Sequence, residues 1–161
     1  MTDTTVITEQ AAARGLIARR GIEHILLGTD ATDESTSADE WARDIALALG
    51  ARVTVVCAFD SPRSFRKRGS IYLTQARDEL EAEAKEVVAE VVASLVDAGV
   101  EATGVAFEGS LSDAVLRLAE DESPDAIVVT GLTPPGGRDY LVGSAAERVV
   151  RHATVPVFVV K

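Results

Sequence analysis

Hydrophobic positions along the chain follow two different periods, which predicts strands that alternate with helices. The segment from Ile22 to Asp30 reads IEHILLGTD, and its consecutive apolar residues are typical of a strand buried on both faces of a parallel sheet. Strand-like patterns also occur at residues 52–59, 100–108, 125–130 and 155–160. We therefore expect a chain of five strands separated by helices.

The segment after the first strand has apolar residues three and four positions apart, which is the spacing of one helix face. Ser37 and Glu40 match a capping box, which predicts that a helix begins there, and Gly50 ends it. The expected inner face of this helix consists of Ala38, Trp41, Ala42, Ile45 and Leu49.

Three further helices are expected. A long helix carries the apolar series from Leu73 to Leu95 and ends before Gly99, and a short one covers residues 144–152. Between them, Gly109 and Ser110 open a helix whose expected inner face is Leu111, Ala114, Val115 and Leu118.

This alternation predicts an α/β fold with a mostly parallel five-stranded sheet and right-handed crossovers, which place helices on both faces. Such sheets bind ligands beyond the carboxyl ends of their strands, where the strand order reverses. Three segments of interest leave strands at that edge: Asp30, the basic loop around residues 62–68, and the glycine-rich stretch that begins at Thr130.

The size and composition favour one globular domain, because 161 residues with 47% hydrophobic content are ample for one core. Residues 1–21 have little core-forming pattern and read as an extension, so the domain is expected over residues 22–161. The first residues lack the basic start and apolar stretch of a signal peptide, and no apolar run is long enough to cross a bilayer. We expect a cytoplasmic protein without a membrane partner.

The chain is strongly acidic, with a net charge of −10 and a pI near 4.6. Such a surface repels nucleic acid and anionic lipid, so neither is an expected partner. The main concentration of positive charge is the segment PRSFRKR, which contains Arg63, Arg66, Lys67 and Arg68. This segment is either a solvated loop or a contact for phosphates or an acidic partner.

Residues suited to catalysis or metal binding are few. Cys57 lies in the apolar run VTVVCAF and reads as a core residue, and His24 lies inside a strand. His152 closes the last helix, where it complements the helix dipole, and Ser110 and Ser144 lack an evident base. No Walker lysine or G-x-G-x-x-G follows a strand in the required place, so neither a P-loop nor a classical dinucleotide fold is supported.

The stretch from Thr130 to Val149, TGLTPPGGRDYLVGSAAERV, carries glycines between a strand pattern and a helix pattern. Gly143 and Ser144 begin the last helix, where free backbone N–H groups favour an anion. Ser144 either caps this helix or hydrogen-bonds a phosphate.

The order ILLGTD, then DAIVVTG, then GSAAERVVRHATVPVFVV resembles the universal stress protein family over about residues 22–161. The resemblance implies an adenine-nucleotide-binding α/β fold of the adenine nucleotide alpha-hydrolase-like type, with strand order 3-2-1-4-5. Family members are often homodimers through antiparallel pairing of the last strands, here Val155 to Val160.

Family members that bind ATP carry G-x2-G-x9-G-[ST] after the fourth strand. Gly131 matches the first glycine, Pro134 falls where the second belongs, and Gly143 with Ser144 matches the closing pair, with eight residues between Pro134 and Gly143 instead of nine. The family's acid after the first strand falls on Asp30, and adenine is read by the backbone near Ala58. The implied cofactor-binding residues are Thr29, Asp30, Ala58, Thr130, Gly131, Thr133, Gly143, Ser144, Ala145 and Ala146.

The resemblance implies a nucleotide-responsive binding or signalling module in the stress response, with ATP or AMP as ligand and at most slow hydrolysis. An interaction dimer of the same fold that binds no nucleotide is the alternative. A receiver domain would need a phosphoacceptor aspartate after the third strand, where the chain reads FEGSLSD. An ATP pyrophosphatase would need glycines directly after the first strand, and GTDATDEST has none beyond Gly28.

Overall fold

The computed structural model describes residues 21–29, 35–60, 71–131 and 143–161. Apart from Gly21, the expected N-terminal extension lies outside these residues. The strands are β1 (His24–Thr29), β2 (Arg52–Phe59), β3 (Ala102–Glu108), β4 (Ala126–Thr130) and β5 (Val157–Val160). The helices are α2 (Ser35–Leu49), α3 (Ile71–Asp97), α4 (Leu111–Glu122) and α5 (Ser144–His152).

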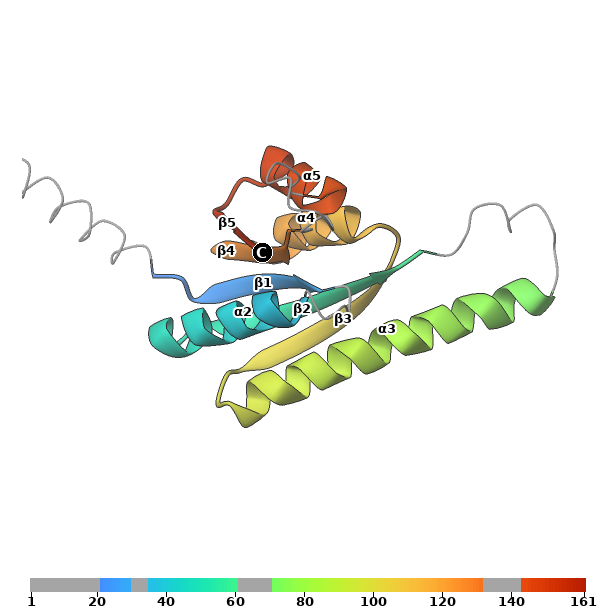
Figure 1. Ribbon diagram of the computed structural model, residues 1–161, viewed down its shortest axis with the longest axis horizontal. Coiled ribbons are helices and arrows are strands. Elements are labelled where there is room, and N and C mark those ends of the chain that lie inside the picture. The colour runs from blue at the N-terminus through green and yellow to red at the C-terminus, as the bar shows by residue number, and fades with distance from the viewer. Residues whose placement is uncertain (1–20, 30–34, 61–70, 132–142) are drawn as a thin grey trace, which may run out of the picture.

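The strands form one sheet in the order β3-β2-β1-β4-β5, and every neighbouring pair is parallel. This confirms the expected fold class and strand order. The chain leaves β1 toward α2 on one side of the sheet and leaves β4 toward α5 on the other side (Figure 1). The strand order therefore reverses between β1 and β4, which is where open α/β sheets bind their ligands.

Helices cover both faces of the sheet, with α2 and α3 on one face and α4 and α5 on the other (Figure 1). Alternate residues of β1 serve the two layers: Ile25 and Leu27 pack toward α2, and Leu26 packs toward α4 and α5. All six residues of β1 are buried, as the uninterrupted apolar run predicted.

The inner face of α2 differs from the predicted one. Ala38 and Ala42 are buried against the sheet together with Ala46, but Trp41 is 59% exposed and Leu49 is 53% exposed. The prediction for these two residues was wrong, because only small side chains let this helix approach the strands closely and the wider side chains lie on its flanks.

The predicted capping box at Ser37 and Glu40 is also wrong. The helix α2 begins at Ser35, so Ser37 lies within the helix rather than at its cap. The run ESTSAD offers several residues that favour caps, and spacing alone does not select the one at which packing on the sheet starts the helix. By contrast, α4 does begin after Gly109 and Ser110, as predicted, and Ser110 is its N-terminal cap.

Candidate functional site

The candidate site lies at the carboxyl ends of β1 and β4. Gly28 pairs with Val129, so the next residues, Thr29 and Thr130, end the two strands side by side. Both continue the alternation of Leu27 and Val128 and therefore project toward the α2 face. The structure thus brings together two of the predicted site residues at the point where the strand order reverses.

The hydroxyl of Thr130 is the polar group of this pair that calls for a ligand. Its Oγ1 atom is buried and has no hydrogen-bond partner in the described structure. Threonine hydroxyls that are buried without a partner are uncommon, because the lost hydration is not replaced. The position of Thr130 at the strand end therefore suits a polar ligand atom.

Gly131 is required by packing against the edge strand β5. Its N–H donates to the carbonyl oxygen of Val160 at 2.7 Å. A Cβ at position 131 would lie 2.8 Å from Cγ1 of Val159 and 3.4 Å from Cγ of Lys161. Sequence reasoning found the glycine but missed Lys161, whose side chain passes beside Gly131 because it directly follows the last paired residue of β5.

The N-terminus of α5 has no side-chain cap. Gly143 is the cap residue, with φ 77° and ψ 143°, and its backbone oxygen accepts from Glu147 N at 2.9 Å. A positive φ of this kind favours glycine. Ser144 is the first residue of the helix, so of the two alternatives for this residue the structure excludes the cap. The hydrogen bond to a phosphate stays a prediction. The N–H groups of Ser144, Ala145 and Ala146 point out of the first turn, where no acceptor exists within the helix.

The neighbouring helix α4 has the opposite arrangement at the same edge of the sheet. The Ser110 hydroxyl accepts from Asp113 N at 3.1 Å and donates to the Asp113 carboxylate at 2.7 Å. Asp113 also forms an ion pair of 2.7 Å with Arg148 of α5. Both helices carry a carboxylate in the first turn, but Asp113 takes part in the cap of α4, whereas Glu147 of α5 pairs with Arg151 at 2.7 Å. The absence of a side-chain cap in the described structure makes α5 the better anion site of the two.

Ala58 lies near the end of β2, half-buried, opposite Phe107 of β3. This places its backbone at the same carboxyl edge as Thr29 and Thr130, on the other side of β1. Asp30, Thr133, Pro134 and the basic segment at residues 62–68 lie outside the described residues, so their predicted contacts stay predictions.

The described structure assembles no metal-binding cluster at this edge. No group of three His, Cys, Asp or Glu side chains within residues 21–29, 35–60, 71–131 and 143–161 is placed to hold a metal ion. His24 begins β1 at the opposite edge of the sheet, and His152 ends α5. Cys57 is buried, as predicted for a core residue.

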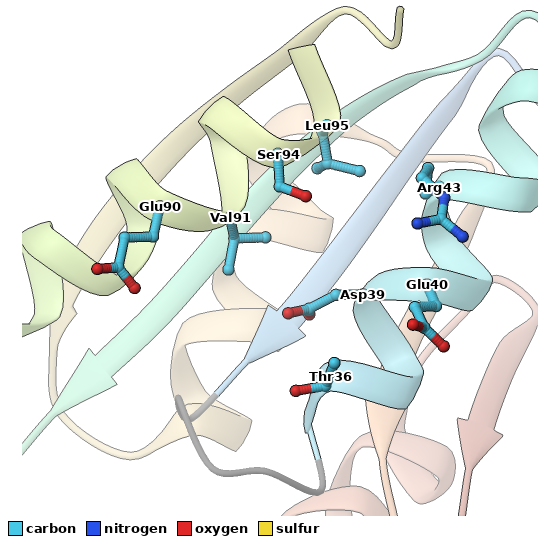
Figure 2. A pocket seen from close by; sticks show the side chains of 8 residues that line it. All are labelled: Thr36, Asp39, Glu40, Arg43, Glu90, Val91, Ser94 and Leu95. Atoms are coloured by element: carbon cyan, nitrogen blue, oxygen red, sulfur yellow. The ribbon is translucent and has the colours of Figure 1, made fainter. Parts of the chain in front are cut away.

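A cavity of about 240 Å³ lies between α2 and α3, and its lining includes the first turns of α2, near the carboxyl end of β1 (Figure 2). Its lining includes the carboxylates of Asp39, Glu40 and Glu90, and Figure 2 shows Asp39 and Ser94 pointing into the space between the helices. Arg43, which also lines it, is paired with Asp44 at 3.0 Å. Such a lining repels phosphate, so this cavity does not suit a nucleotide.

Comparison with known proteins gives the family of the chain. The sequence model of the universal stress protein family matches residues 21–161. Universal stress protein MJ0531 of Methanocaldococcus jannaschii is 32% identical over 139 residues, which are 85% of this chain and 81% of that protein.

Solved structures share the fold. The structure of MJ0577 from the same organism superposes with a TM-score of 0.75 at 23% identity, over 88% of this chain and 96% of that chain. A universal stress protein in complex with cAMP has a TM-score of 0.62 at 25% identity, over 87% of this chain and 97% of its own. The universal stress protein from Archaeoglobus fulgidus in complex with dAMP has a TM-score of 0.61 at 20% identity, over 87% of this chain and 98% of that chain.

Proposed function

The chain belongs to the universal stress protein family, and from that premise we propose that it binds an adenine nucleotide at the carboxyl edge of β1 and β4. In this proposal it acts in the cytoplasm as a nucleotide-responsive binding or signalling module of the stress response, and not as a fast enzyme. Along the described residues, no helix has the length and apolar character needed to span a membrane.

The observation that carries the proposal is the buried, unpartnered hydroxyl of Thr130 at the point where the strand order reverses. Without a ligand this group loses its hydration and gains no hydrogen bond from the described residues in return. A ribose hydroxyl or a phosphate oxygen supplies the missing partner. That two relatives of the same fold are complexes with cAMP and dAMP supports an adenine nucleotide as the ligand class.

The N-terminus of α5 would hold the phosphate. The first-turn N–H groups of Ser144, Ala145 and Ala146 and the positive end of the helix dipole favour an anion there, and no side chain competes as a cap. Lys161, beside Gly131, adds a positive charge to the same corner. Asp30, Thr29 and the backbone near Ala58 would hold the nucleoside.

Compared with family members that have the full glycine pattern, this chain should bind ATP more weakly. Its affinity for AMP and ADP should be reduced less. Pro134 stands where the second glycine belongs, and proline lacks the N–H that a phosphate would accept. The nucleoside side of the site has no such change.

Replacing Thr130 with valine tests the proposal, because the two side chains have nearly the same shape. Valine removes an unsatisfied buried group, so the free protein should gain about 1 kcal/mol of stability in urea denaturation. The same change should weaken AMP binding about two- to tenfold in calorimetry. A Thr103→Val variant, on the exposed part of β3, should change neither.

Unchanged AMP affinity in Thr130→Val, or no AMP binding by the unaltered protein, would overturn the proposed contact. The second outcome would favour an interaction dimer without nucleotide, which the free edge strand β5 supports: Phe158 there is 40% exposed. Native mass spectrometry of the purified protein, followed by its denaturation, reports bound nucleotide and subunit number together.

A further inference from the structure

A buried polar cluster lies at the amino edge of the sheet, opposite the candidate nucleotide site. His24, the first residue of β1, is only 3% exposed, and its Nε2 lies 2.8 Å from the Thr54 hydroxyl of β2. Thr54, 2% exposed, donates to Oε2 of Glu122 at 2.9 Å. Glu122 is the last residue of α4, so the cluster joins three elements.

The direction of these bonds fixes where the imidazole carries its proton. The Thr54 hydroxyl has one hydrogen, which it gives to the Glu122 carboxylate. Its oxygen must therefore accept from Nε2 of His24, so the neutral imidazole carries its hydrogen on Nε2. Nδ1 is then a lone-pair atom, buried and without a partner in the described structure.

Adding a proton to this ring places a charged N–H at the buried Nδ1, for which the described residues offer no acceptor. Burial is the main cause that lowers the pKa of His24 below its ordinary value, and the positive charge of Arg52 lowers this pKa further. The negative charges of Glu122 and Asp125 act in the opposite direction but do not outweigh these two causes.

The start of β1 is held by bonds that depend on the position of His24. The N–H groups of Glu23 and His24 both donate to Oδ2 of Asp125, at 2.9 and 3.0 Å. The backbone N–H of Asp125 donates to the carbonyl oxygen of His24 at 2.9 Å. The backbone N–H of Arg52 donates to the carbonyl oxygen of Glu23, also at 2.9 Å. Moving the imidazole toward water would disturb this set of bonds.

We propose that the His24–Thr54–Glu122 cluster is a proton-sensitive latch, which holds the amino edge of the sheet together while the imidazole is neutral and loosens when the imidazole takes up a proton. The latch lies at the opposite end of the strands from the nucleotide site, so this inference does not depend on the proposed function.

The sign of the effect follows from the direction of the pKa shift. In the unfolded chain the pKa of His24 is near its ordinary value of 6.5, and in the folded protein it is lower. Below that pH the unfolded chain binds more protons than the folded protein. The stabilising contribution of neutral His24 is therefore complete above pH 6.5 and is lost as the pH falls through 6.5 toward the native pKa.

The chain has two histidines, which gives the test a matched control. His24→Gln removes the buried imidazole, and His152→Gln removes the exposed one at the end of α5. Urea denaturation at about pH 7.5 and about pH 5.5, without nucleotide, measures the loss of folding equilibrium constant. One histidine whose pKa in the unfolded chain is the ordinary one lowers the folding equilibrium constant by at most about tenfold between these two pH values.

Between the two pH values, the folding equilibrium constant should fall further in the unaltered protein and in His152→Gln than in His24→Gln. All three proteins have the same carboxylates, so the difference reports His24. The imidazole of His24 should also titrate below pH 6.5 in NMR, and protection of the Glu23 and His24 amides from exchange should fall at the lower pH.

An equal loss in His24→Gln would overturn the latch. A His24 pKa at or above 6.5 in the unaltered protein would do the same, and this measurement decides the question even where His24→Gln does not fold.

Discussion

Gly131 and Val159 are packed so closely that position 131 has no room for a side chain: a Cβ there would meet Val159 Cγ1 at 2.8 Å. The glycine of the motif is thus needed by the junction between β4 and β5, whether or not a nucleotide binds. We expect Gly131→Ala to lower the free energy of unfolding by about 1 to 3 kcal/mol, the usual cost of overpacking. Urea denaturation of the nucleotide-free protein measures this change.

Two further variants separate packing from other causes. Gly21→Ala should have little effect, because the nearest atom lies 4.0 Å from the added Cβ. In a double-mutant cycle, Gly131→Ala should cost less when Val159 is already alanine, because the clashing methyl group is gone. An equal cost in both backgrounds would assign the effect to the backbone instead.

Asp125 is expected to stabilise the fold by holding the start of β1. Its Oδ2 accepts from two backbone N–H groups, those of Glu23 and His24. Asp125→Ala should therefore lower the free energy of unfolding by about 1 to 2 kcal/mol, a reduced value because the site is partly open to water. Asp121→Ala is the control: its pairing with Arg117, at 3.8 Å between exposed side chains, should contribute close to nothing. Equal effects of the two variants would contradict this role of Asp125.

The predicted homodimer through β5 needs a different test variant from the one that the sequence suggests. Val159→Asp follows from the apolar run alone, but Val159 is half-buried and packs into the layer formed with α4 and α5. A charge there would damage the monomer. Phe158, on the other side of the strand and 40% exposed, is the better position.

We expect Phe158→Asp to convert the dimer to a folded monomer, because a charge would oppose burial of this edge against a second copy. Sizing with light scattering at micromolar concentration measures the mass, and circular dichroism checks the fold. Leu47→Asp, which places the same charge at a 50% exposed position on α2, should leave the dimer intact. A monomeric unaltered protein would refute the prediction.

Elements with clear sequence boundaries were predicted at their observed residues. The strand at 52–59 and the helix at 144–152 agree with β2 and α5, since breaking residues flank each apolar pattern. The capping box at Ser37 and the burial of Trp41 were wrong, because the approach of α2 to the sheet, and not helical spacing, decides which turn starts the helix and which side chains fit beneath it.

The candidate site was predictable in position but not in physical cause. Sequence order placed Thr29, Thr130, Gly131 and Ser144 near one sheet edge. The unpartnered hydroxyl of Thr130 and the close contact of Gly131 with Val159 depend on pairing with distant strands, which no local pattern encodes. Asp30 and Thr133 stay predictions.

The loop before α5 gives the last prediction, which tests why this chain departs from the ATP-binding pattern of the family. Pro134 removes one backbone donor to phosphate, and a hydrogen bond to a charged acceptor contributes about 1.5 to 3 kcal/mol. Replacing Pro134 with glycine and inserting one residue before Gly143 restores G-x2-G-x9-G-S. This variant should bind ATP about ten- to a hundredfold more tightly than the unaltered protein in calorimetry, because its loop again supplies that donor.

The affinity for AMP serves as the internal control of this experiment, because in the proposed site most contacts of AMP are on the nucleoside side. It should change much less than the affinity for ATP. A glycine substituted for Pro135 instead, with the same insertion, should restore less, since the pattern requires the glycine at position 134. Equal ATP affinities for the Pro134→Gly variant and the unaltered protein would show that the proline does not limit binding. Gly136 and Gly137 would then be the residues to test as a substitute phosphate cradle, because glycines allow backbone N–H groups to converge on an anion.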